Sequence, residues 1–73
     1  MPKHIDDIKK LATITADLEL SPRIRVEALE LIGNIGTHEA LLVLLEVAGN
    51  DKLTGKEREL ALKQARRIVK SGR

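Results

Sequence analysis

The feature that most constrains this chain is its similarity to itself at a shift of 33 residues. The matched pairs are Ile8 and Leu41, Leu11 and Leu44, Ser21 and Thr54, Arg25 and Arg58, Ala28 and Ala61, Leu29 and Leu62, and Ile35 and Ile68. Periods of about 20–50 residues are typical of arrays in which each unit covers its apolar face with its neighbour. The 73 residues therefore hold about two units, each a pair of helices, in a single domain over residues 1–73.

Hydrophobic periodicity and capping residues define the first two helices. Over residues 2–17, apolar side chains recur at three- and four-residue steps between charged ones, which predicts an amphipathic helix. Ser21 is the expected N-cap of the second helix, with Pro22 at its first helical position. This helix is expected to end between Gly33 and Gly36.

The same signals define the other two helices. Thr37 is the expected cap of the third helix and Gly49 its stop, while Thr54 and Glu57 form a capping box for the fourth. The third helix is the most apolar, so we expect it alone to have neighbours on three sides. Its expected core residues are Leu41, Leu44, Leu45 and Ala48. The fold class predicted is all-α.

Residues 21–51, SPRIRVEALELIGNIGTHEALLVLLEVAGND, resemble a HEAT-like repeat of the short bacterial type, whose first helix carries Arg-x-x-Ala-x-x-x-(Leu/Ile)-Gly-x-(Leu/Ile)-Gly. Residues 54–72 match more loosely, with Arg66 and Arg67 where Gly33 and Asn34 stand. The resemblance implies a four-helix αα-superhelix, or solenoid, of about two repeats that serves as a scaffold. It implies no single reaction, because some family members are chromophore lyases and others are DNA-binding repair proteins. Ankyrin repeats remain a minor alternative, although their Thr-Pro-Leu-His turn is missing.

Composition argues against catalysis. The chain has no cysteine for a thiolate or a zinc site, and none of its glycines forms a phosphate-binding loop. His4 and His38 begin the first and third helices, but no tight spacing with Asp6, Asp7 or Glu39 predicts a metal site. We therefore expect no enzyme, no metal and no cofactor.

Two arginines recur at the repeat period, and each follows an acid or amide in the preceding turn. Arg25 follows Asp17, and Arg58 follows Asn50 and Asp51. The family resemblance implies a structural role, in which the arginine bonds across to the turn of a neighbouring repeat. Ligand binding by these guanidinium groups is the alternative.

One face of the third helix is the predicted protein-binding surface, because two aliphatic side chains are expected to lie exposed between acids. The 33-residue shift places lysines of the first helix beside it. The residues are Glu39, Leu42, Val43, Glu46, Lys9 and Lys10.

A second surface is expected at the end of the stack. About two repeats leave the terminal helices uncovered, so the fourth helix is expected to expose those of Leu60, Leu62, Ala65 and Val69 that do not face the third. A homodimer through a terminal helix, with two-fold symmetry, follows from this expectation.

Cations gather along the fourth helix in a basic stripe of Lys63, Arg66, Arg67 and Lys70. A solvated helix face with cations near its C-terminus accounts for most of this pattern. The functional interpretations are an acidic surface on a partner protein or nucleic-acid phosphates, the latter with marked salt dependence but without base reading, because phosphate contacts carry no sequence information.

The function predicted is therefore a small non-catalytic protein-interaction or assembly scaffold, with a nucleic-acid-binding accessory protein as the alternative. The formal net charge is only +2, and the longest apolar run, residues 40–45, is far shorter than the ~20 residues that span a bilayer. We expect a cytoplasmic protein with no export signal and no membrane association.

Overall fold

The computed structural model describes residues 4–71, with side chains from Asp7 onward. This part of the chain contains four helices and no strand, which confirms the all-α prediction. The helices are α1 (His4–Ala16), α2 (Pro22–Ile35), α3 (His38–Ala48) and α4 (Gly55–Lys70). Residues 2 and 3, expected in the first helix, lie outside the described residues.

Local capping sets where the helices begin and end. The hydroxyls of Ser21 and Thr37 each accept a backbone N–H three residues on, and Thr54 with Glu57 forms the capping box at the start of α4. Gly36 ends α2 in the left-handed conformation, with φ of 69°, which glycine adopts without steric cost. These predicted caps are confirmed.

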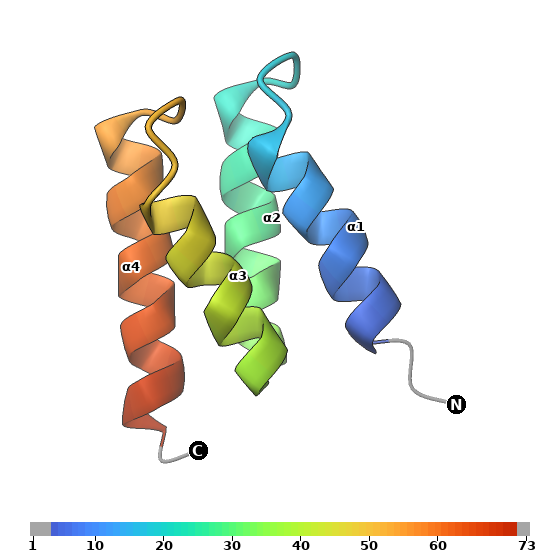
Figure 1. The fold of residues 1–73 in the computed structure, drawn as a ribbon, viewed down its shortest axis with the longest axis vertical. Coiled ribbons are helices and arrows are strands. Elements are labelled where there is room, and N and C mark those ends of the chain that lie inside the picture. The colour runs from blue at the N-terminus through green and yellow to red at the C-terminus, as the bar shows by residue number, and fades with distance from the viewer. Residues whose placement is uncertain (1–3, 72–73) are drawn as a thin grey trace.

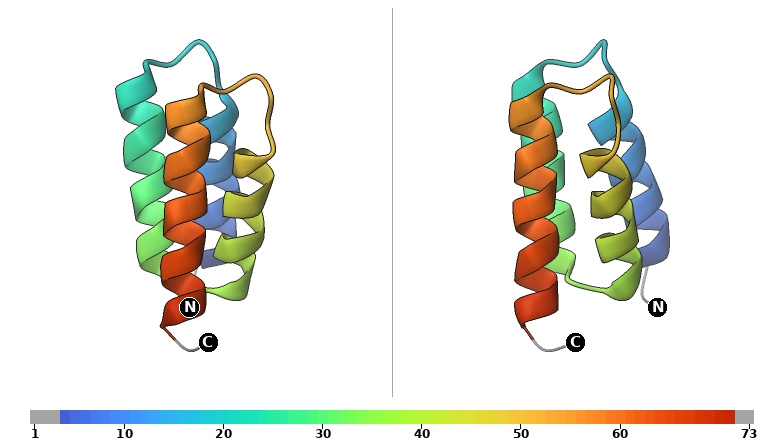
Figure 2. Two further views of the ribbon diagram at one scale, coloured as in Figure 1. Left: turned by 90° about the vertical axis from the view of Figure 1, so that its left-hand side faces the viewer. Right: turned by 60° about the vertical axis from the view of Figure 1, so that its left-hand side comes forward.

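The helices form two antiparallel hairpins that lie side by side. The α1/α2 hairpin stands on the right in Figure 1 and the α3/α4 hairpin on the left. Helices α1 and α3 lie in one layer, and α2 and α4 lie in the other (Figure 2). Both α2 and α3 contact all three other helices, so the expectation that only the third helix has three neighbours is wrong.

The core fills the space between the hairpins and within each of them. Its largest fully buried apolar side chains are Leu29, Ile32 and Leu44. Leu45, which was expected in the core, is instead 47% exposed, and Val69, one of the α4 residues expected to be exposed if they do not face the third helix, is 60% exposed. They lie on the side of α3 and α4 that has no neighbouring hairpin, whereas burial requires a neighbour.

Helices α2 and α4 approach each other closely at Gly33. A Cβ atom at this position would overlap Oε1 of Gln64, a buried residue of α4, and would lie 3.1 Å from its Cβ. The close packing of Gln64 therefore explains the glycine at this position. Backbone conformation does not, since α2 is regularly helical at Gly33.

Candidate protein-docking site

Arg25 is buried in the first turn of α2, where it joins this helix to the α1/α2 loop and to α4. Its Nη1 donates to the carbonyl oxygens of Leu20 and Asp17, at 2.6 and 3.2 Å, in the loop between α1 and α2. Its Nε and Nη2 donate to Oε2 of Glu57 in α4, at 3.2 and 2.8 Å. The arginine thus contacts the turn of its own hairpin and a carboxylate of the next, rather than the turn of a neighbouring repeat.

Glu57 is the partner that sequence reasoning missed. Its Oε1 accepts the backbone N–H of Thr54 in the capping box, while Oε2 receives the Arg25 guanidinium. The sequence predicted only the role of Glu57 in the capping box, and its contact with Arg25 was not expected. Asp17 contributes its backbone carbonyl to Arg25, while Oδ1 of its carboxylate accepts the N–H of Glu19.

Arg58, the equivalent of Arg25, has a different environment. Its side chain makes one hydrogen bond within the described residues, from Nε to the carbonyl oxygen of Ala48 at 3.0 Å. The guanidinium is half-buried at the end of α3. It therefore retains donors with which to bind a further acceptor.

An apolar groove runs between α3 and α4 on the side facing away from the other hairpin. We call it the α3/α4 groove, and it is lined by Leu41, Leu45, Leu62, Ala65, Arg66, Val69 and Lys70. Leu62 is 41% exposed and Val69 is mostly exposed, as the expectation for a terminal helix allowed, whereas Ala65 is buried. Arg66 and Lys70 place two cations at its edge, so the groove combines an apolar floor with positive charge.

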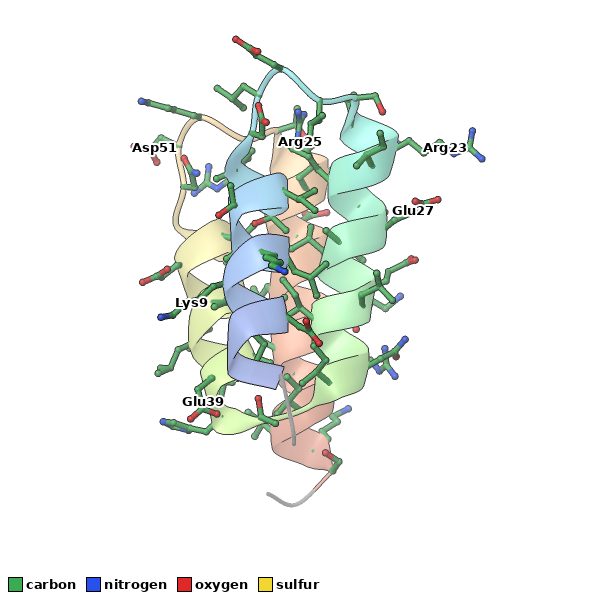
Figure 3. The ribbon with its side chains drawn as sticks, turned by 90° about the vertical axis from the view of Figure 1, so that its right-hand side faces the viewer. Lys9, Arg23, Arg25, Glu27, Glu39 and Asp51 are labelled. Atoms are coloured by element: carbon green, nitrogen blue, oxygen red, sulfur yellow. The ribbon has the colours of Figure 1, made fainter. Side chains whose placement is uncertain are left out.

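The predicted protein-binding face does not form one surface. Glu39, Leu42 and Glu46 are exposed on α3, but Val43 is half-buried against the core beside α1, so its expected exposure is wrong. Lys9 lies on the same side of the molecule as Glu39 (Figure 3). Lys10, although exposed, lines a separate hollow between α1 and α2.

The basic stripe lies on the solvent-exposed side of α4. All four of its residues are exposed: Lys63, Arg66, Arg67 and Lys70. Its members differ in their surroundings. Arg67 lies beside the end of α2 and donates from Nη1 to Oε1 of Gln64 at 2.6 Å, whereas Arg66 borders the α3/α4 groove.

Other chemistry is not assembled in the described part of the chain. No group of three or more metal-ligating side chains occurs there, and the side chains of His4 and Asp6 lie outside it. No helix in residues 4–71 combines the length and apolar character needed to cross a membrane.

Comparison with known proteins finds no counterpart. The chain matches no protein-family model, no curated protein and no solved structure. Its function must therefore be inferred from its own surfaces.

Proposed function

We propose that this chain is a small non-catalytic docking module of the HEAT-like type, working in the cytoplasm, that binds another protein. The observation that carries the proposal is the α3/α4 groove. Leu45, Leu62 and Val69 leave a contiguous apolar surface between two helices, and a second helix fits such a groove through its own apolar side chains.

The arrangement of the hairpins supports the repeat interpretation. In a solenoid, each helix pair stacks on the next in the same orientation, and the 33-residue shift maps α1 onto α3 and α2 onto α4. Equivalent helices lie in the same layer and run in the same direction (Figures 1 and 2). We propose a short αα-superhelix of about two repeats on this basis.

The docking function is tested with two matched charge substitutions. Leu62→Glu places a carboxylate in the groove, while Leu31→Glu places one at a comparably exposed leucine of α2, outside the groove. Proteins captured by the parent chain from its native lysate should be lost with Leu62→Glu and retained with Leu31→Glu, because burying an unpaired carboxylate opposes docking. Circular dichroism checks that both variants remain helical. Equal capture by parent and Leu62→Glu would contradict the proposal.

Nucleic-acid binding is the second candidate, favoured by the four exposed cations of the basic stripe. Phosphate contacts by these cations would give an affinity for duplex DNA that falls linearly with the logarithm of salt concentration. The variant carrying Lys63→Glu and Arg67→Glu should then bind DNA at least about tenfold more weakly in low salt. If the parent chain shows no DNA binding, or the charge reversal leaves it unchanged, the stripe is a solvated face.

A further inference from the structure

The two hairpins present the same face to different surroundings. Ile8, Leu29 and Arg25 of the first hairpin are 3%, 1% and 5% exposed, because the second hairpin covers them. The 33-residue shift carries these positions to residues of the α3/α4 groove and its end, against which no further hairpin packs within residues 4–71. The matched pairs are Ile8 and Leu41, Ala12 and Leu45, Arg25 and Arg58, Leu29 and Leu62, and Ile32 and Ala65.

The contacts between the two hairpins therefore show which side chains pack against this face of a helical hairpin. Against the first hairpin, α4 places Glu57, Ala61, Gln64 and Ile68, which are all buried and share one side of the helix. Glu57 meets the Arg25 guanidinium with two hydrogen bonds, and the smaller and apolar side chains that follow fill the space below it. On the α2 side of this face the occupant is therefore a helix with a carboxylate near its N-terminal end and a mostly apolar stripe after it, while α3 covers the α1 side.

We propose that the α3/α4 groove binds an acidic amphipathic helix of another protein, with a carboxylate of that helix paired to Arg58. This inference rests on the proposed docking function and adds the chemistry of the partner. Arg58 lies one turn before Leu62 on the same face of α4, so it stands at one end of the groove. Its guanidinium has donors left after bonding Ala48, as a bidentate contact with a carboxylate requires.

Charge on the groove selects the partner further. Arg66 and Lys70 line it toward the C-terminal end of α4, and no acidic residue lines it. A helix with carboxylates beside its apolar stripe matches this positive border, whereas a basic helix is repelled.

A second copy of the chain fits the groove poorly. If a second copy stacked on the groove with its first hairpin, Ile24 would take the place of Glu57, because the two positions are related by the 33-residue shift. Ile24 supplies no carboxylate for Arg58. Arg66 occupies the position of Gly33, whose missing side chain allows α2 and α4 to approach closely. These mismatches favour a different protein over the homodimer expected from sequence.

A designed peptide tests the inference with the intact chain. The probe is a helical peptide of about 18 residues, long enough for marginal helicity, with one glutamate followed by leucines at the spacing of Glu57, Ala61, Gln64 and Ile68. The control peptide has glutamine in place of that glutamate. We expect saturable binding of the probe to the parent, and about threefold to tenfold weaker binding of the control peptide.

The protein variants form the other half of the design. Leu62→Glu should weaken probe binding at least about tenfold, while Leu31→Glu should leave it unchanged. Arg58→Gln should weaken binding of the glutamate peptide but not of the glutamine peptide, since the two groups act as a pair in a double-mutant cycle. Melting curves identify any loss of folding in Arg58→Gln, and the comparison of the two peptides on the parent does not depend on that variant.

Several results would overturn the inference. It is wrong if the probe does not bind, if glutamate and glutamine peptides bind the parent equally, or if Leu31→Glu weakens binding as much as Leu62→Glu. It is also wrong if sedimentation shows self-association that Leu62→Glu abolishes, because the occupant would then be a second copy. Failure of the acidic peptide together with Leu62-dependent capture of a native protein would leave the docking function standing and remove only the acidic helix.

Discussion

Replacing Arg25 with alanine is expected to lower the free energy of unfolding by about 3–5 kcal/mol, because the change removes one partner of a buried ion pair. The Glu57 carboxylate, 3% exposed as a side chain, would lose the charge that compensates it. The carbonyl oxygens of Asp17 and Leu20 would lose a donor as well. A domain of this size has a stability of about 5 kcal/mol, so the variant should keep only about 0–2 kcal/mol and be partly unfolded at room temperature.

Arg23→Ala is the matched control for this change. Arg23 is exposed in the first turn of the same helix and points away from the molecule (Figure 3). Its removal should change the free energy of unfolding by less than about 0.5 kcal/mol. Urea denaturation followed by circular dichroism measures both variants, and an unaltered midpoint for Arg25→Ala would contradict the structural role of Arg25.

Gly33→Ala is expected to destabilise the chain by about 1–3 kcal/mol, although alanine is the better helix former. The new methyl group would displace the side chain of Gln64, which would lose its bond to Arg67. The contact with Cβ of Gln64 cannot be relieved by rotating that side chain, so α2 and α4 must also separate slightly.

Gly55→Ala offers the same chemical change with the opposite expectation. A Cβ atom at Gly55 meets nothing within 4 Å, and the residue begins α4. Alanine there should raise the free energy of unfolding by up to about 1 kcal/mol, because it restricts the unfolded chain. Thermal melts of the two variants should shift in opposite directions. A stabilised Gly33→Ala would show that α2 and α4 are not in close contact at this point.

The helices and their caps could be predicted from sequence because they depend on residues three or four positions apart. Ser21, Thr37 and the Thr54–Glu57 capping box each satisfy a backbone N–H within their own first turn. The 33-residue similarity likewise predicted two equivalent pairs of helices, since it records equal spacing of core positions.

The sequence predicted less accurately which side of each helix is covered by another helix. Leu45 and Leu44 are neighbours in one leucine run, and periodicity alone does not show which of them faces another helix. Val43 was expected at the surface because it lies opposite the core positions of α3, yet α1 is close enough to cover half of it. The Arg25–Glu57 pair spans 32 positions along the chain, beyond the reach of any local pattern.

The α3/α4 groove was foreseen only in part. The expectation that a terminal helix would expose apolar side chains pointed to Leu62 and Val69. It did not include Leu41 and Leu45, which were expected in the core and which form the other wall. The role of Arg58 at the end of the groove follows only from comparing it with the Arg25 contacts.

The most direct test of the docking surface is a methyl NMR titration of the intact chain, labelled at leucine and valine, with the acidic helical peptide. The account predicts that the methyl signals of Leu45, Leu62 and Val69 shift as the peptide saturates the protein, while those of Leu31 stay in place. Shifts confined to Leu31, or to Leu42 on the outer face of α3, would contradict docking in the α3/α4 groove.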